Sequence, residues 1–122
     1  MVKLIFCLRR RADISEEEFH RYWRDEHGPL VARHASTLGI RRYVQVHTVS
    51  PEWNALLAAG RGSPEAFDGV AELWFDDTDA LAREAGTQEG RAAAAELADD
   101  EKRFIDHDRS PLFVAEEHVV IG

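Results

Sequence analysis

Apolar residues recur with two different periods along this chain. Four short runs rich in β-branched and aromatic side chains predict strands at residues 2–9, 40–49, 67–75 and 112–121. Residues 15–36 and 78–106 instead place apolar side chains at helical spacing, which predicts two helical regions. The resulting order, β-α-β-β-α-β, is typical of a ferredoxin-like α+β fold, with a four-stranded antiparallel sheet and both helices on one face.

The first helical region carries its own start and interruption signals. Ser15 is followed three residues later by Glu18, the spacing of a capping box, so a helix is expected to begin there. Pro29 lies in the middle of the pattern and has no N–H for the carbonyl of Asp25. We therefore expect the helix to kink or break near Pro29.

Residues 50–65 interrupt the regular patterns. The segment contains two prolines, two glycines and a serine that disfavour regular structure. We expect a long loop with one helical turn around residues 53–59. Loops of this length inside a small domain are uncommon and often functional.

The predicted strands leave neither face of the sheet clearly polar. In the first strand Leu4, Phe6 and Leu8 alternate with Ile5 and Cys7, and the last strand shows the same mixture. Helices on one face of such a sheet would leave a large apolar patch on the other. A second copy packed sheet to sheet would cover it, which predicts a homodimer in the form of a dimeric α/β barrel.

Composition restricts the class of partner. The 122 residues suit a single domain, residues 1–122, and 44% of them are hydrophobic, as in globular chains. The net charge of −8 argues against nucleic-acid binding and against docking on an anionic membrane. The single cysteine, Cys7, excludes an intrachain disulfide, and neither a signal-peptide pattern nor a membrane-spanning run is present. We therefore expect a soluble, cytoplasmic protein that binds a small molecule or another protein.

His27 is the strongest candidate for chemistry. At 100° per residue it shares one side of the first helix with Phe19, Trp23, Leu30 and His34, so its side chain is expected to face the sheet. An imidazole among aromatic rings, beside carbonyls freed at the interruption, is well suited to act as a general acid or base. The alternative is a half-buried histidine whose only partner is a backbone carbonyl.

Aromatic side chains could complete a site around His27. Tyr43 could polarise or protonate a substrate oxygen, although a tyrosine that merely packs at a strand edge is the commoner case. Trp74 could wall a pocket for a flat or cyclic ligand, together with Trp23 and Phe6. The alternative for Trp74 is a place in the core or at an interface.

The sequence predicts neither a metal nor an organic cofactor. His20, His27 and His34 follow one another at intervals of seven residues, about 10.5 Å along a helix, whereas two helical ligands of one ion need a spacing of three or four. No dinucleotide- or phosphate-binding fingerprint is present. The acidic stretches at residues 76–79 and 99–101 are interpreted as solvated helix ends.

Several segments together resemble the EthD-type members of the dimeric α/β-barrel superfamily. The likeness rests on residues 3–6, 18–23, 27–30, 42–43, 67–75 and 100–104. The helical segment that ends in His-Gly-Pro-Leu is the most specific of these, and the resemblance covers nearly the whole chain.

This resemblance implies a ferredoxin-like protomer, a homodimer and a pocket between the sheet and the helices. It also implies cofactor-free chemistry, because relatives of this type include enzymes that cyclise, isomerise, decarboxylate or dehydrate aromatic, polyketide-like or lactone substrates. In such relatives a histidine that matches His27 often serves as acid or base. A tyrosine on the next strand, for which Tyr43 is the candidate, can assist it.

Three functional hypotheses follow. The first is a lyase or isomerase in which His27 moves a proton beside a carbonyl, while Tyr43 or a backbone donor holds the enolate oxygen. The second is a cofactor-free monooxygenase whose electron-rich phenolic substrate itself reduces oxygen, with Trp74 and Trp23 shaping the pocket. The third is a non-catalytic dimer that binds a hydrophobic metabolite or serves as an accessory protein.

Overall fold

The computed structural model describes residues 1–122 and contains one four-stranded sheet. Its strands are β1 (Val2–Leu8), β2 (Arg42–His47), β3 (Gly69–Phe75) and β4 (Leu112–Ala115). They lie in the order β2-β3-β1-β4, and every neighbouring pair is antiparallel. This is the ferredoxin-like topology expected from the sequence, with the first and third strands at the centre.

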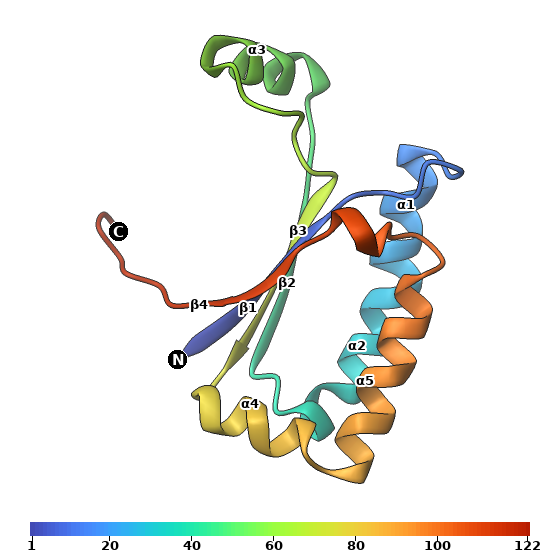
Figure 1. Ribbon diagram of the computed structural model, residues 1–122, viewed down its shortest axis with the longest axis vertical. Helices are drawn as coiled ribbons and strands as arrows, with labels where there is room; N and C mark the ends of the chain where they lie inside the picture. The colour runs from blue at the N-terminus through green and yellow to red at the C-terminus, as the bar shows by residue number, and fades with distance from the viewer.

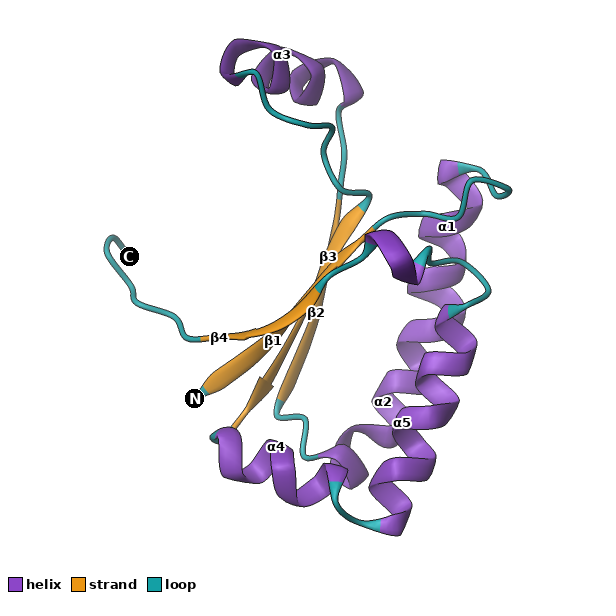
Figure 2. Cartoon of the chain, viewed as in Figure 1, coloured by secondary structure: helices purple, strands orange, loops and turns teal.

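Helices cover one face of the sheet and leave the other bare. They are α1 (Glu16–Tyr22), the π-helical η1 (Trp23–His27), α2 (Gly28–Leu38), α3 (Pro51–Arg61), α4 (Thr78–Ala85), α5 (Gln88–Glu101) and the 3₁₀ turn η2 (His107–Arg109). Figure 1 shows α1, α2, α4 and α5 on the same side of the sheet, whereas α3 projects beyond the ends of β2 and β3. Figure 2 shows no helix over the opposite face. None of the helices combines the length and apolar character needed to cross a membrane.

Two groups of buried side chains fill the space between the sheet and the helices. The first group consists of Phe6, Leu8, Phe19, Trp23, Ala71, Phe104 and Ile105. The second group consists of Leu30, Val31, Ile40, Phe75 and Leu97. Tyr43 and Leu73 pack against both groups, so the two form one continuous core.

The first helical region begins as predicted but passes Pro29 without breaking. The Ser15 hydroxyl caps α1 by accepting a hydrogen bond from the backbone N–H of Glu18 (3.1 Å). Because Pro29 has no N–H, the chain widens into one π-helical turn, in which the Gly28 N–H donates to the Trp23 carbonyl. The expected break is therefore wrong, because η1 leads directly into α2 and Pro29 lies in the first turn of α2. The irregularity expected there takes the form of the π-helical turn.

The outer strands are shorter than the sequence pattern suggested. β4 pairs only with β1, and the ladder ends where Ala115 lies opposite Lys3. Since β1 begins at Val2, no strand is available to pair with the following residues, and residues 116–122 form no regular structure. The strand predicted at residues 112–121 thus ends six residues early.

Residues 51–61 form a helix where a loop with one turn was expected. Pro51 occupies the first turn of α3, which suits its fixed φ, and Gly62 ends the helix with a φ of 62°. No residue of α3 is buried, and its large apolar side chains Trp53, Leu56 and Leu57 are exposed. The alanines and leucines of this segment therefore outweigh its glycines locally.

The second helical region divides into α4 and α5 at a tight turn. Thr87 caps α5, because its hydroxyl accepts a hydrogen bond from the Gly90 N–H (2.9 Å). A Cβ at Gly90 would lie 1.8 Å from the carbonyl oxygen of Glu84, so only glycine permits this close approach. The turn sends α5 back along α2, which brings Asp100 and Glu101 to η1 (Figure 1).

Candidate functional site

His27 is buried at the end of η1 and faces α5 rather than the sheet. Its side chain is only 5% exposed, and its ring packs against Phe104 with 5.1 Å between centroids. Nδ1 lies 2.8 Å from an oxygen of Asp100, and Nε2 lies 3.9 Å from Oε2 of Glu101. The expected burial of His27 is confirmed, but the expected direction is wrong, because α5 occupies the space beside η1.

Asp100 determines which nitrogen of His27 is free. One carboxylate oxygen accepts from the Tyr22 hydroxyl (2.6 Å), and the other faces Nδ1 of His27. Since a carboxylate only accepts, the pair holds a proton on Nδ1 and leaves Nε2 directed at Glu101. Burial and the hydrogen bond to Asp100 raise the pKa of Tyr22 to about 12, so this hydroxyl remains a donor.

Glu101 is the second carboxyl group beside His27. Its Oε1 accepts from Nε2 of His107 (2.9 Å), and its side chain is 20% exposed. Burial raises the pKa of the Glu101 carboxyl, while His107 and His27 act in the opposite direction. A carboxyl tuned in this way holds or releases a proton closer to neutrality than an ordinary glutamate does.

An apolar cavity of about 310 Å³ lies between the sheet and helices α4 and α5. Its walls are formed by Leu4, Phe6, Leu38, Ile40, Leu73, Phe75, Leu81, Ala85, Ala94, Leu97, Ala98, Glu101 and Leu112. Glu101 is the single polar residue among them, so it supplies the one ionisable side chain of the cavity wall. An apolar chamber with one convergent polar group is the usual form of a small-molecule site.

Tyr43 lies on the helix-facing side of β2, close to the same cluster. Its hydroxyl accepts a hydrogen bond from Nε2 of Gln45 (2.8 Å), which also donates to the carbonyl of Trp23 (2.8 Å). Burial raises the pKa of Tyr43 and the charge of Glu101 adds to this effect, whereas the hydrogen bonds with Gln45 and Trp23 lower it. Tyr43 thus lies within the electrostatic reach of Glu101, although it does not line the cavity.

The three aromatic residues expected to form a pocket have separate locations. Phe6 lines the cavity, whereas Trp23 is 1% exposed within the core. Trp74 lies on the opposite face of the sheet, where its indole N–H donates to Glu117 (2.8 Å) and Lys3 lies over its ring. Side chains alternate between the two faces along β3, and the neighbours of Trp74, Leu73 and Phe75, face the helices, so Trp74 faces away from them. Trp74 therefore does not wall this cavity.

A chain of hydrogen bonds runs from Tyr43 toward the ends of α1 and β2. Gln45 Oε1 lies 2.8 Å from Nε2 of His47, and Nδ1 of His47 lies 2.6 Å from Nδ1 of His20. Burial lowers the pKa of both imidazoles. Both rings therefore favour the neutral form, in which one nitrogen donates and the other accepts.

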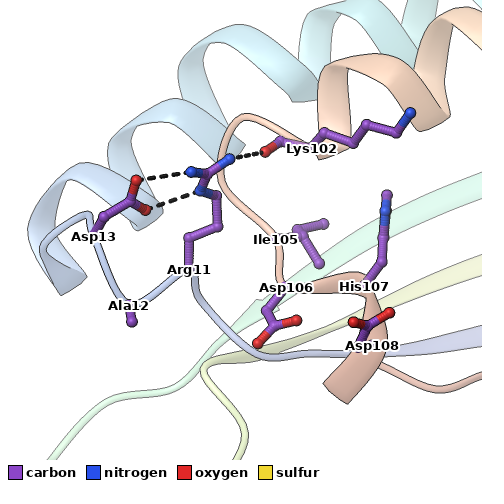
Figure 3. Close-up of a pocket in the computed structure, with 8 residues that line it drawn as sticks. All are labelled: Arg11, Ala12, Asp13, Lys102, Ile105, Asp106, His107 and Asp108. Carbon is purple, nitrogen blue, oxygen red and sulfur yellow. Dashed lines mark hydrogen bonds and ion pairs between the residues drawn. The ribbon is translucent and has the colours of Figure 1, made fainter.

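A larger hollow lies at the surface near η2, and its arginine is already engaged. Figure 3 shows Arg11 between Asp13 and the carbonyl of Lys102. The guanidinium makes two hydrogen bonds to Asp13 (2.9 and 2.7 Å) and one to that carbonyl (2.8 Å). No three His, Cys, Asp or Glu side chains in the structure are spaced as metal ligands. The cluster around His27 is therefore the main candidate for chemistry.

Sequence reasoning missed both carboxylates of this cluster. The stretch at residues 99–101 was interpreted as a solvated helix end, yet Asp100 and Glu101 both contact His27. A signal was present: both residues extend the buried stripe of α5, lying three and four positions after Leu97 and just before Phe104. Charged residues on an apolar stripe deserve the same scrutiny as a buried histidine.

The fold and the cluster together define a ferredoxin-like α+β protein with an apolar cavity and a buried His–Asp–Glu site. Residues 11–108 match the EthD domain model, and the chain belongs to the EthD family. A comparison with curated protein sequences found no match.

Solved structures support the same fold. An ethyl tert-butyl ether d (EthD) family protein from Bacillus halodurans C-125 is 23% identical, with a TM-score of 0.64, and the match covers 97% of this chain and 99% of that one. A dimeric protein of ferredoxin-like fold from Bacteroides fragilis is 16% identical, with a TM-score of 0.60 and 95% of both chains covered. A dimeric ferredoxin-like protein from Thermobifida fusca is 12% identical, with a TM-score of 0.55, and 93% of this chain and 88% of that chain are covered.

Proposed function

We propose that this protein is a cofactor-independent lyase or isomerase that moves a proton on a cyclic, aromatic or polyketide-like metabolite. His27 serves as general acid or base, and Tyr43 assists it. One observation carries the proposal: Asp100 binds Nδ1 of His27, while Nε2 is directed at Glu101, the polar end of an apolar cavity.

The chemistry follows from the hydrogen bonds of the imidazole. Asp100 keeps Nδ1 protonated and stabilises the imidazolium that forms when Nε2 takes a proton. A carbon next to a carbonyl supplies that proton, and the enolate oxygen requires a donor nearby. The phenol of Tyr43, whose raised pKa keeps it protonated, is the donor that we propose for this role; it lies beside the cavity rather than in its wall, within the electrostatic reach of Glu101.

The proposal includes a second copy of the chain on the bare face of the sheet. The outward side chains of this face include the apolar Ile5, Val44 and Val70 around Glu72, whose carboxylate pairs with Lys3. Similar proteins from Bacteroides fragilis and Thermobifida fusca are described as dimeric. The single cysteine suits an enzyme of the reducing cytoplasm.

The test compares His27→Asn with His34→Asn. Asparagine at position 27 can still donate to Asp100, but it lacks a group equivalent to Nε2. His34 lies on the same helical face and bonds to Glu96 instead (2.9 Å), so it provides a matched control. Proton transfer is measured by NMR as deuterium uptake from D₂O into a panel of cyclic 1,3-diketones and enol lactones.

We expect His27→Asn to fold and to lose exchange by about 10²–10⁴-fold, the usual contribution of a positioned proton-transfer group. The His34→Asn protein should exchange at the wild-type rate. A His27→Asn protein that melts early yet exchanges normally per folded molecule would show a purely structural histidine. Binding of the panel without exchange by the wild type would favour the non-catalytic alternative.

A further inference from the structure

We propose that the cavity accepts an uncharged, mainly apolar carbonyl or phenol compound, and that Glu101 is the side chain that touches it. His27 remains the acid or base of the proposed function, and it exchanges its proton with the ligand through Glu101. This inference rests on the proposed function, because it assigns the ligand class and the contact residue of the same site.

The geometry places Glu101 between His27 and the cavity. Glu101 belongs to the cavity wall, whereas His27 does not and is only 5% exposed. The nearest approach of the two is 3.9 Å, from Nε2 to Oε2. A molecule in the cavity therefore meets the carboxyl group first, and the imidazole lies behind it.

The lining determines the charge of the ligand. Twelve of the thirteen lining residues are hydrophobic, and none is a lysine or an arginine. A carboxylate or phosphate in this cavity would lie against apolar walls without a cation, beside a group that is itself acidic. An uncharged molecule avoids both costs, and its oxygen can share a proton with Glu101.

The groups that face Glu101 account for its charge state. They are His107 on η2, His27 on η1, Asp100 on α5 and Tyr43 on β2. Burial and Asp100 favour the protonated carboxyl, whereas the two histidines favour the carboxylate. This balance leaves Glu101 able to take and return a proton within one catalytic cycle.

The proton transfer balances without an oxidant. Glu101, as carboxylate, takes a proton from the carbon next to the carbonyl, and the electrons of the broken C–H bond form the enolate. His27 favours the carboxylate that starts the cycle, and Asp100 holds the imidazole in place. Return of the proton to another carbon gives an isomer, and the protein ends as it began.

The binding test uses two probes that share a naphthalene ring, neutral 2-naphthol and the anion 2-naphthoate. Isothermal titration at neutral pH should give at least tenfold tighter binding of 2-naphthol. In Glu101→Gln this preference should shrink severalfold, because the buried acid is gone. Glu96→Gln changes a more exposed carboxylate of the same helix and should keep the wild-type preference. Equal or tighter binding of 2-naphthoate by the wild type would overturn the inference.

A second measurement examines whether His27 acts through Glu101. Carbon-13 NMR of labelled glutamate carboxyls, assigned with Glu101→Gln, should show the Glu101 signal moving when 2-naphthol binds. In His27→Asn the pKa of Glu101 should rise, because the imidazole whose electrostatic effect lowers it is removed. A Glu101 signal that stays unchanged on 2-naphthol binding and has the same pKa in His27→Asn as in the wild type would contradict the inference.

The exchange assay separates the two proposals. Loss of exchange in both Glu101→Gln and His27→Asn, with 2-naphthol still bound, supports both. Loss in His27→Asn alone overturns the role of Glu101 and leaves the proposed function standing. Normal exchange in His27→Asn with loss in Glu101→Gln overturns the role of His27 and supports Glu101 as the contact residue.

Discussion

His27, His20 and His47 differ in the groups that their side chains contact. His27 lies against a carboxylate, whereas His20 and His47 face each other through their Nδ1 atoms at 2.6 Å. Two imidazoles can share such a contact only while at least one nitrogen is unprotonated. The His20–His47 pair therefore makes stability depend on pH, independently of any chemistry at His27.

The sign of that dependence follows from the lowered pKa values. Between those values and the ordinary 6.5, the unfolded chain binds more protons than the folded protein. The stabilisation is complete above about pH 6.5 and is lost as the pH falls toward the lowered pKa values. We expect the free energy of unfolding, measured with urea, to fall less between pH 7 and pH 5 in His20→Gln than in the wild type.

The control for this measurement is His118→Gln, which removes a histidine that is 82% exposed. Its pH dependence should match that of the wild type. Each additional proton bound on unfolding changes stability by about 1.4 kcal/mol per pH unit, so the difference is measurable. Identical slopes for His20→Gln and wild type would mean that the pair does not titrate on unfolding.

Elements of this fold meet at close approaches that depend on glycine. Gly69 begins β3 directly beneath Trp23, and a Cβ there would lie 2.4 Å from the indole Cζ3 and 2.9 Å from the carbonyl of Val46. Neither the buried indole nor the paired backbone of β2 can move aside cheaply. This contact fixes the distance between η1 and the sheet.

We expect Gly69→Ala to destabilise the protein by about 1–3 kcal/mol or more, because it overpacks the core. Gly60→Ala offers the opposite case, since a Cβ at this position in α3 meets nothing within 4 Å. It should stabilise the protein by about 0.5–1 kcal/mol through the better helix propensity of alanine. Thermal and urea unfolding of the two variants check both signs, and a neutral Gly69→Ala would contradict the close packing of η1 on β3.

At the scale of the whole molecule, the bare face of the sheet is the main unexplained surface. Val46 on β2 and Phe113 on β4 are 45% and 46% exposed on this face, which also carries Ile5, Val44 and the Lys3–Glu72 ion pair. Burying such a face against a second copy removes apolar surface from water without new secondary structure. The opposite face of the sheet, by contrast, is already covered by the helices of the same chain.

We expect Val46→Glu to separate the proposed dimer, because a carboxylate would be buried in the interface without a cation. The dimer dissociation constant should rise by at least about a hundredfold, which corresponds to about 2.7 kcal/mol. Ala32→Glu adds the same charge at an exposed position of α2 and should leave the association unchanged. Sedimentation velocity distinguishes the outcomes, and a wild-type protein that sediments as a monomer at micromolar concentration would contradict the pairing.

Local sequence patterns were sufficient for the order of the elements. The capping box of Ser15, the four apolar runs and the buried stripe of Phe19, Trp23 and Leu30 depend on neighbours only a few residues apart, and the structure confirms them. Alternation along β2 also places Tyr43, Gln45 and His47 on one face, where Gln45 is hydrogen-bonded to both of the others. The helix at residues 51–61 was missed, because the glycines and prolines of residues 50–65 were given more weight than the alanines.

The composition of the site was decided only by the tertiary structure. His27 and Asp100 are 73 positions apart, and no local periodicity reveals that the tight turn at Gly90 brings α5 back beside η1. The same packing turned His27 away from the sheet and placed Glu101 at the end of the cavity. Sequence periodicity determines which side of an element is buried, but the neighbour that buries it depends on how distant elements pack.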